Sequence, residues 1–401
     1  MIPIEFLLFG ATLLGVAVFH RHTLAIALLG LAAITAYKVM FGDFHGAPGA
    51  VGLLFHLEAE WVILTNLFAL LVGFALLSRH FEQSQLPHLL PRFLPDDWKG
   101  GLVLLALVFA ISGFLDNIAA AMIGATVART IFRGNVHIGF LAGIVAAANA
   151  GGAGSVIGDT TTTMMWLDGV SPLDVWAAYV ASIAAFLAFA IPAARRQHRH
   201  SPILKDPDLV VRVDVSRLII VMLVLVAAIV ANVYANNLPE GRTGFFPYIG
   251  ATVAGVLLLL TPWRRPDWSI VPEAARGSVF LLALVLSASM MPVDALPPAS
   301  PQTTFGLGFV SAVFDNIPLT KLALEQGGYD WGALAYAVGF GGSMIWFGSS
   351  AGVAVSNLFP GAKSVGQWLR HGWFVAVAYV VGFSVFMILV GWHPHAPHRT
   401  F

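Results

Sequence analysis

The chain has 401 residues, of which 58% are hydrophobic and 10% are charged, and its formal net charge at pH 7 is zero. Its mean hydropathy of +0.82 excludes an ordinary soluble domain, in which roughly a quarter of the residues are charged. The balanced charge gives no reason to expect nucleic acid as a partner. The absence of cysteine excludes disulfides, thiol redox chemistry and thiolate metal sites.

Apolar runs long enough to span ~30 Å of hydrocarbon recur along the whole chain, and none alternates as a membrane strand would. The first run has an acid near its start and no basic segment before it, so we expect a span and not a signal peptide. Two segments, 100–127 and 304–324, carry a polar break and are expected to be re-entrant hairpins. The predicted crossings are residues 2–19, 23–40, 52–77, 137–165, 172–192, 215–235, 245–261, 277–291, 330–357 and 368–392. The sequence thus predicts an all-α polytopic membrane protein with about ten transmembrane helices.

Lysine and arginine are unevenly distributed between the predicted loops. The connection at 193–214 is the most basic, and the positive-inside rule places it in the cytoplasm. Counting crossings puts the other basic loops on the same side, whereas GDFHGAPG, LDGVSP and VDALPPASPQ contain neither Lys nor Arg. Both termini are therefore expected on the opposite side of the membrane.

The two halves of the chain repeat in the same order. SGFLDNI at 112–118 matches SAVFDNI at 311–317, and GGAGSVIGD at 151–159 matches GGSMIWFGS at 341–349. Counting crossings gives the halves opposite orientations, which is typical of secondary transporters whose site lies where glycine-broken helices meet. The predicted organisation is a first inverted repeat at 1–192 with a broken helix at 137–165, a basic linker at 193–214, a second repeat at 215–392 with a broken helix at 330–357, and a tail at 393–401.

Polar residues at the breaks suggest a cation site. Gly151, Gly152 and Gly158 let the backbone leave helical angles, and at membrane depth the freed carbonyls must be buried in protein or face a wet cavity. An ionisable group at that depth costs about 2.5 to 3.5 kcal/mol, which makes it a functional candidate. Hard cations such as sodium prefer oxygen ligands. The carboxylates at the predicted breaks and hairpin tips are Asp116, Asp159 and Asp315.

Several of these residues have a purely structural alternative. Asp159 could only cap the half-helix that follows it, and the threonines at 160–163 could only donate to a carbonyl four residues back. Glycine pairs could serve close helix packing.

Other charged residues are expected to be solvated. Lys321 follows Asp315 by six positions and is expected to reach outward to water; the alternative is a pair with a buried carboxylate. Glu58 and Glu60 are expected at a solvated helix end; the alternative is a role in an access path or a pH response.

Four motifs carry a resemblance to a known family. NAGGAGSVIGDTTTTMMW at 149–166, FLDN at 114–117, SAVFDNIPLT at 311–320 and GFGGSMIWFGSSAGV at 339–353 resemble the NhaD-type sodium/proton antiporters of the ion-transporter superfamily, which also contains arsenite, citrate and dicarboxylate permeases. The resemblance implies two re-entrant hairpins, expulsion of sodium or lithium in exchange for protons, no cofactor, a bacterial cytoplasmic membrane and a homodimer. The residues it implies for ion handling are Asp116, Asn117, Asn149, Asp159, Thr161, Thr162, Ser311, Asp315, Asn316, Ser349 and Ser350.

Sodium favours an ionised carboxylate and a proton favours the neutral form, so we expect both to compete for a cluster of Asp116, Asp159 and Asp315. The alternatives keep the acids and change the chemistry. One is a sodium- or proton-coupled permease for an anion such as citrate, a dicarboxylate or arsenite, held at half-helix N-termini. The other is an intramembrane hydrolase with paired aspartates. Because the three aspartates repel anions and nothing beyond them suggests hydrolysis, the sequence favours a cation transporter and not an enzyme.

Overall fold

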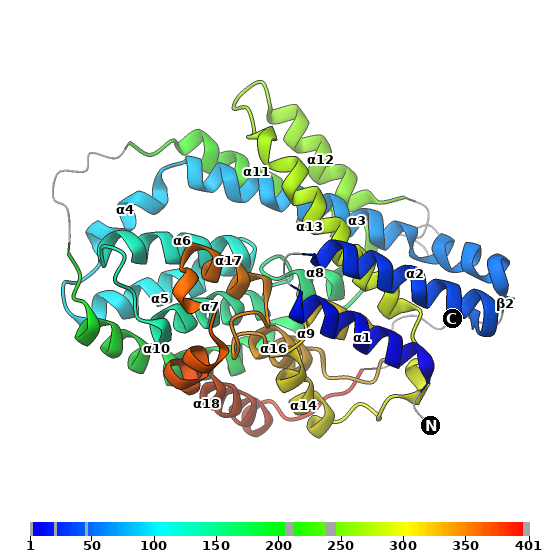
Figure 1. Ribbon diagram of the computed structural model, residues 1–401. Coiled ribbons are helices and arrows are strands. Elements are labelled where there is room, and N and C mark those ends of the chain that lie inside the picture. Colours follow the sequence, from blue (N-terminus) through cyan, green and yellow to red (C-terminus); the bar gives the residue numbers. More distant parts are fainter. Residues whose placement is uncertain (1–2, 20–21, 45–46, 205–211, 237–245, 396–401) are drawn as a thin grey trace.

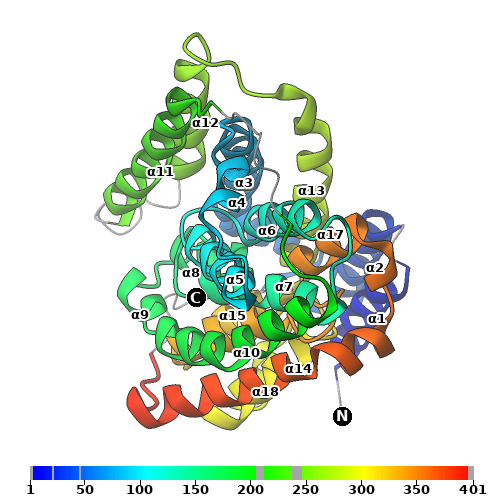
Figure 2. The ribbon, with the colours of Figure 1, turned by 90° about the vertical axis from the view of Figure 1, so that its left-hand side faces the viewer.

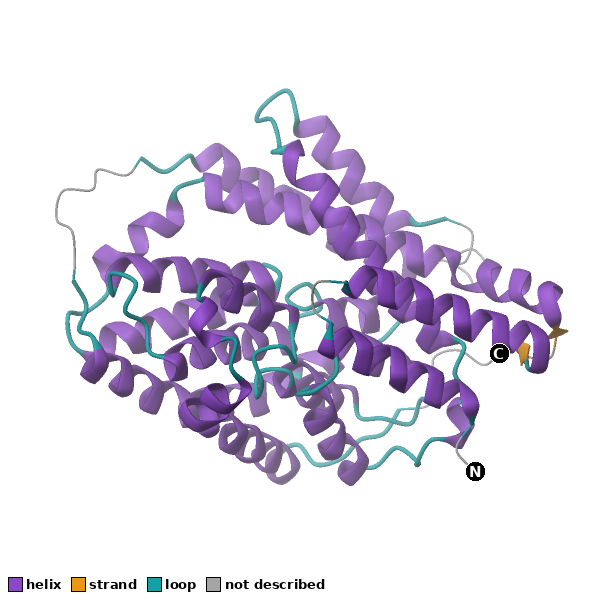
Figure 3. Cartoon of the chain, viewed as in Figure 1, coloured by secondary structure: helices purple, strands orange, loops and turns teal. Residues whose placement is uncertain are grey.

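The computed structural model describes residues 3–19, 22–44, 47–204, 212–236 and 246–395 (Figure 1). Nearly all of the regular structure is helical, and the strands in these ranges form one short antiparallel hairpin of Asp43–Phe44 (β1) and Ala47–Pro48 (β2) (Figure 3). The helices of the first half are α1 (Ile4–Val18), α2 (Thr23–Phe41), α3 (Gly49–Gln83), α4 (Leu86–Phe93), α5 (Trp98–Ser112), α6 (Asn117–Ile131), α7 (Ile138–Ala153), α8 (Thr160–Leu167), α9 (Pro172–Trp176) and α10 (Ala178–His200). The helices that follow are α11 (Val215–Asn236), α12 (Tyr248–Leu260), α13 (Val271–Ser289), α14 (Pro301–Ser311), α15 (Asn316–Gln326), α16 (Trp331–Gly341), α17 (Ser350–Leu358) and α18 (Val365–Leu389), with short 3₁₀ turns at Trp268–Ile270, Val293–Ala295 and Pro360–Ala362.

The prediction of an all-α polytopic membrane protein is confirmed. Large apolar side chains cover the outside of the bundle, and Leu29, Leu259 and Ile388 are 70%, 79% and 79% exposed. Such a surface suits contact with lipid, which is as apolar as these side chains. The segments of the described residues that are long and apolar enough to cross a membrane are Thr23–Phe41, Gly49–Gln83, Pro172–His200, Val215–Ala235, Trp268–Ser289 and Val365–Leu389.

The centre of the bundle is formed by α7 and α16. Every residue from Gly139 to Ala153 and from Trp331 to Gly341 is buried. Helices α10 and α18 pack on each other and on α7 along one side, whereas α11 and α12 pack on α3 at the opposite edge (Figures 1 and 2). Because α7 and α16 are short and made largely of small residues, they suit a position enclosed by other helices.

Several boundaries differ from the predicted ones. Helix α10 continues to His200, so the predicted linker at 193–214 begins inside a helix, and the segment AARRQHRH contains no residue that would end it. Helix α4 was not among the elements expected from the sequence, since its two prolines argue against a helix. Residues 205–211 of the linker and 396–401 of the tail lie outside the described residues.

The basic loops predicted to share one side do meet at one end of the bundle. Arg79 at the end of α3 binds Asp267 (Nε to Oδ2, 3.0 Å), and Arg264 after α12 binds Asp214 before α11 (Nε to Oδ2, 3.0 Å). These pairs join three of the loops that we place in the cytoplasm. The sidedness itself, and the inverted relation of the two halves, stay predictions.

Candidate functional site

Both predicted hairpins turn at an aspartate that caps a helix. The Asp116 carboxylate accepts a hydrogen bond from the Ile118 amide (3.2 Å) at the start of α6, and the Asp315 carboxylate accepts one from the Ile317 amide (3.0 Å) at the start of α15. The positive end of a helix dipole and its free amides stabilise an anionic side chain at this position. The same motif therefore gives the same local structure in both halves.

Both glycine-rich segments interrupt a helix. The chain leaves α7 at Ala153 and resumes as α8 at Thr160, and it leaves α16 at Gly341 and resumes as α17 at Ser350. Asp159 caps α8 through the Thr161 amide (3.1 Å), and Ser349 caps α17 through the Gly352 amide (3.3 Å). The N-cap alternative for Asp159 is thus correct for one of its two oxygens.

Glycine is required at these breaks because backbone meets backbone there. A Cβ atom on Gly158 would lie 2.2 Å from the carbonyl oxygen of Ser112, and one on Gly348 would lie 2.5 Å from that of Ala312. No side chain fits at such distances. The same holds for Gly151 against the Phe109 carbonyl oxygen (2.0 Å), Gly341 against that of Gly308 (2.3 Å) and Gly152 against that of Gly158 (2.6 Å).

A serine at the end of each hairpin's first arm holds that arm to the broken helix. Ser112 donates from Oγ to the Ala148 carbonyl (2.6 Å), and Ser311 donates to the Val338 carbonyl (2.7 Å). All four positions correspond between the two matched segments. The hairpin and the broken helix of each half therefore form one connected unit.

Asn149 links the two halves. Its Oδ1 accepts from Asn117 Nδ2 (3.0 Å), and its Nδ2 donates to Ser343 Oγ (2.9 Å) and Ser349 Oγ (3.1 Å). These side chains are buried, so the network is shielded from water and its loss would leave unsatisfied polar groups. Ser343 was missed at the sequence level; the available signal was a hydroxyl inside the second glycine break.

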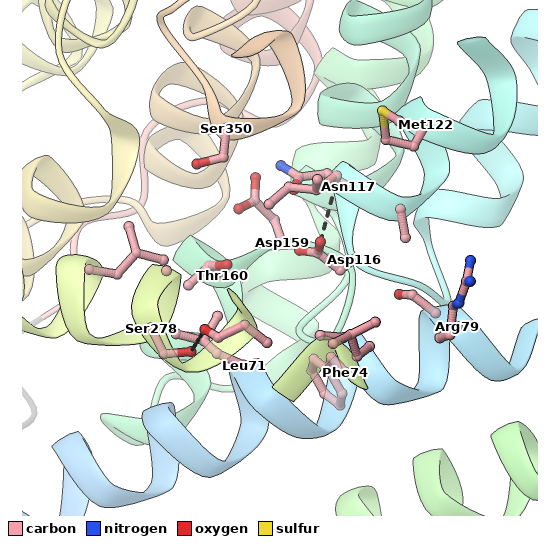
Figure 4. A pocket seen from close by; sticks show the side chains of 18 of the residues that line it. Leu71, Phe74, Arg79, Asp116, Asn117, Met122, Asp159, Thr160, Ser278 and Ser350 are labelled. Atoms are coloured by element: carbon pink, nitrogen blue, oxygen red, sulfur yellow. Dashed lines mark hydrogen bonds between the residues drawn. The ribbon is translucent and has the colours of Figure 1, made fainter. Parts of the chain in front are cut away.

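A pocket of about 400 Å³ opens beside this network. Asp116, Asp159, Thr160 and Ser350 face it from the starts of three different helices, α6, α8 and α17 (Figure 4). The pocket runs along α3 to Arg79, at the end where the basic loops meet. The other polar residues that line it are Ser78, Glu82, Asn117, Ser278 and Asn316.

Asp159 has an unusual environment. It is 2% exposed, and its Oδ2 atom has no hydrogen-bond partner among the described residues. A Cβ atom on Gly339 would lie 3.3 Å from this oxygen, so the glycine leaves it room. A buried carboxylate oxygen without a partner is costly, and such an atom calls for a ligand.

The threonines after Asp159 divide into two kinds. The Thr163 hydroxyl donates to the Asp159 carbonyl four residues back (2.9 Å), as the structural alternative states, and the Thr162 hydroxyl is likewise used on the backbone, at the carbonyls of Ser155 (2.6 Å) and Asp159 (2.9 Å). The hydroxyl of Thr161 has no partner among the described residues, and Thr160 lines the pocket. Since an eight-residue helix turns each of four successive threonines to a different side, the sequence could not tell them apart.

The second hairpin contributes beside the pocket. Asn316 and Ser350 line it, whereas Asp315 is not among the lining residues; the Ser350 hydroxyl donates to Asp315 Oδ2 (3.5 Å). In the described part of the chain no three His, Asp or Glu side chains are grouped as a metal site. A shared role of Asp116, Asp159 and Asp315 in cation binding stays a prediction, and neutral oxygens would have to complete any cation shell.

The expectation that Lys321 reaches outward is wrong. Lys321 is 1% exposed, and its Nζ lies 3.0 Å from Glu60 Oε2 and also binds Glu325. Glu60 is therefore buried as well, whereas Glu58 is exposed. The sequence could not show this because Glu60 lies 261 positions from its partner.

Comparisons with known proteins agree with the motifs, although no family model matches the chain. Sodium/proton antiporter 1 of Arabidopsis thaliana is 28% identical over 344 residues, which cover 75% of this chain and 56% of that protein. The Na⁺/H⁺ antiporter NhaD of Alkalimonas amylolytica is 26% identical over 332 residues, covering 71% and 68%. NhaD of Vibrio cholerae is 26% identical over 327 residues, covering 71% and 69%. The chain thus spans little more than half the length of the plant relative and about two thirds of the bacterial ones.

Proposed function

We propose that this chain, a relative of the NhaD-type sodium/proton antiporters, exchanges sodium or lithium ions for protons across a membrane. The observation that carries the proposal is Asp159 Oδ2, a buried carboxylate oxygen for which the described part of the chain offers no hydrogen-bond partner, in a pocket that it shares with Asp116. Relatives named as antiporters support the same function. The resemblance further leads us to propose a bacterial cytoplasmic membrane as the location and a homodimer as the assembly.

Burial explains why one site would serve both ions. An ionised carboxylate away from water needs a partner of opposite charge, which can be either a proton or a metal cation. Asp159 can carry one of them at a time. Exchange follows if the site opens to one side of the membrane when a cation is bound and to the opposite side when a proton is bound.

The pocket offers the oxygens that a small hard cation requires. Asp116 and Asp159 would supply negative charge. Thr160, beside Asp159 at the start of α8, and Asn316 and Ser350, at two further helix starts, would supply neutral oxygens. The remaining candidates would act indirectly. Asn117, Asn149 and Ser349 would hold the two halves in register, and Ser311 and the glycines would fix the breaks.

Access to this pocket would come from one side in the present conformation. The pocket reaches Arg79, whereas Glu60, 19 residues earlier in α3 and about 28 Å away along the axis, is tied to Lys321 of α15. Opening toward the other side would require this ion pair to separate or to move as a unit. We propose that it closes the end of the protein opposite the basic loops.

A vesicle assay tests the proposal. Inverted membrane vesicles are acidified inside and followed with a pH-sensitive dye while sodium, lithium or citrate is added. We expect sodium or lithium to release protons with the wild-type chain and with Asp294→Asn, which changes an exposed carboxylate, but not with Asp159→Asn. A sodium response of wild-type size in Asp159→Asn, at equal protein level, would remove Asp159 from the mechanism, and a response to citrate alone would favour the anion permease.

A further inference from the structure

A second pocket lies far from the aspartates, where the start of α7, the end of α10 and the start of α18 meet. Its volume is about 410 Å³. Every described residue that lines it is basic, so no carboxylate is among these lining residues. The lining residues are His137, Arg196, Arg199, His200, Arg370 and His371.

The histidines are packed together at this point. The ring of His137 lies 5.0 Å from that of His371 and 5.4 Å from that of His200. His137 is also the N-cap of α7, since its Nδ1 accepts from the Gly139 amide (3.1 Å). His200 is held by Asn135, whose Oδ1 lies 2.8 Å from its Nε2. Three segments distant in sequence are thus fixed around one space.

Arg196 is the rigid member of the set. Its Nη1 donates to the His371 carbonyl (2.9 Å), and its guanidinium lies 5.0 Å from the ring of Phe374. Arg199 and Arg370 are exposed at the rim. Among the described residues no carboxylate forms an ion pair with any of these arginines. Clustered positive charge without a counter-ion is unfavourable unless an anion binds.

We propose that this pocket binds a phosphate group, presented by an anionic phospholipid or by soluble phosphate. Guanidinium groups match phosphate oxygens with paired hydrogen bonds, and basic pockets between helices at the cytoplasmic end are the sites that hold anionic headgroups. The position agrees with the sidedness predicted from the basic loops. No part of the sodium/proton exchange is needed for this binding.

The surroundings favour a lipid as the source. Trp373, 52% exposed, follows the pocket along α18, and Arg195 lies 4.8 Å from the ring of Trp98 at the same end. Leu369 and Val377 of α18 are exposed beside them. Exposed tryptophan next to apolar surface is typical of the level at which headgroups meet hydrocarbon. A headgroup in the pocket would leave its acyl chains against this surface.

The histidines give the binding a pH dependence. Burial, followed by the charges of His371, His200 and Arg196, lowers the pKa of His137 to about 4. A bound phosphate would offset the repulsion from these groups and would favour the protonated ring. Because the free ring of His137 takes up a proton only near pH 4, phosphate binding is expected to become tighter as the pH falls from 6 toward 4, whereas binding through the arginines alone would change little.

The test uses the whole purified protein after removal of bound lipid. Phosphatidylglycerol, phosphatidylcholine and inorganic phosphate are added in turn, and binding is measured by native mass spectrometry and by the shift in melting temperature. The variant is Arg199→Gln combined with Arg370→Gln. The matched control is Arg129→Gln, an exposed arginine of α6 outside the pocket.

We expect phosphatidylglycerol to bind the wild-type chain and the control alike, and the double variant at least tenfold more weakly. This corresponds to the loss of one charge-assisted hydrogen bond, about 1.5 kcal/mol. Binding of inorganic phosphate without lipid, with the same dependence on the arginines, would keep the site and make its ligand soluble. No binding of either ligand, equal affinity for phosphatidylcholine, or undiminished binding by a folded double variant would overturn the proposal.

Discussion

Replacing Lys321 with methionine should destabilise the protein more than replacing either of its carboxylate partners. Lys321 is the positive member of a buried cluster with Glu60 and Glu325. Its removal leaves two carboxylates close together without a cation. Removing Glu60 as glutamine leaves one lysine paired with one glutamate, so the cluster becomes neutral.

The expected changes in the free energy of unfolding follow from the net charge that each variant leaves in the cluster. Breaking a buried pair so that one charge remains uncompensated costs about 3 to 5 kcal/mol, and we expect that range for Lys321→Met. Glu60→Gln removes a hydrogen bond to a charged group, which contributes about 1.5 to 3 kcal/mol. The triple change of Lys321→Met, Glu60→Gln and Glu325→Gln should recover much of the loss, because no charge is then left in the cluster.

The free energy of unfolding can be measured by denaturant titration in mixed micelles, followed by tryptophan fluorescence. Lys99→Met serves as the control, since Lys99 is an exposed lysine at 3.9 Å from Asp97 and exposed pairs contribute less than about 1 kcal/mol. If Lys321→Met costs no more than Glu60→Gln, or if the triple change is the least stable of all, the account of this cluster is wrong.

The remaining predictions concern the breaks, the link between halves and pH. Gly158→Ala and Gly348→Ala should each destabilise the fold by about 1 to 3 kcal/mol or more, because their Cβ atoms would lie 2.2 and 2.5 Å from backbone carbonyl atoms. The control is Gly255→Ala, where a Cβ atom would meet no atom within 4 Å, and it should leave the free energy of unfolding unchanged. Equal costs for the three variants would contradict the packing argument. Asn149→Ala removes three buried hydrogen bonds, each contributing about 1 kcal/mol, whereas Ser343→Ala removes one of them and should cost less; the reverse order would be inconsistent with the network. For His137, whose folded pKa of about 4 lies below its unfolded value near 6.5, the unfolded state binds the proton first, so stability should fall as the pH drops from 6.5 to 4. Melting curves of His137→Asn, which can keep the N-cap, should lack this part of the acid sensitivity, and an unchanged pH profile would count against it.

Much of the site could be predicted from the sequence because its polar residues and glycines interrupt segments that are otherwise apolar enough to contact lipid. A run of glycines and polar residues at 149–166 cannot continue a lipid-facing helix, and the structure breaks at 154–159. The turn at Asp116 follows from an Asp-Asn pair in an apolar hairpin. In both cases a local pattern determines a local structure.

What the sequence could not provide are the contacts between distant segments. The pairing of Lys321 with Glu60, and of Asn149 with Ser343, depends on how the helices pack, and no local pattern indicates it. The sequence also could not show which way each threonine hydroxyl points, because Thr161 and Thr162 are neighbours in one short helix and differ only in the side of the helix on which they lie. The predicted reach of Lys321 to water failed because two buried acids offset the cost of its charge.

The space beside Asp159 comes from a difference between the two matched halves. Asn149 stands two residues before the glycine pair of the first half, and Gly339 stands two residues before that of the second. Where one copy places an amide, the other places no side chain at all, and the carboxylate oxygen of Asp159 occupies the neighbourhood. If the two halves arose by duplication of one segment, both keep the glycine-broken helix, but only the first has an aspartate before the resumed helix. The oxygen that we propose as an ion ligand therefore has no counterpart in the second half, where Ser349 takes the position of Asp159.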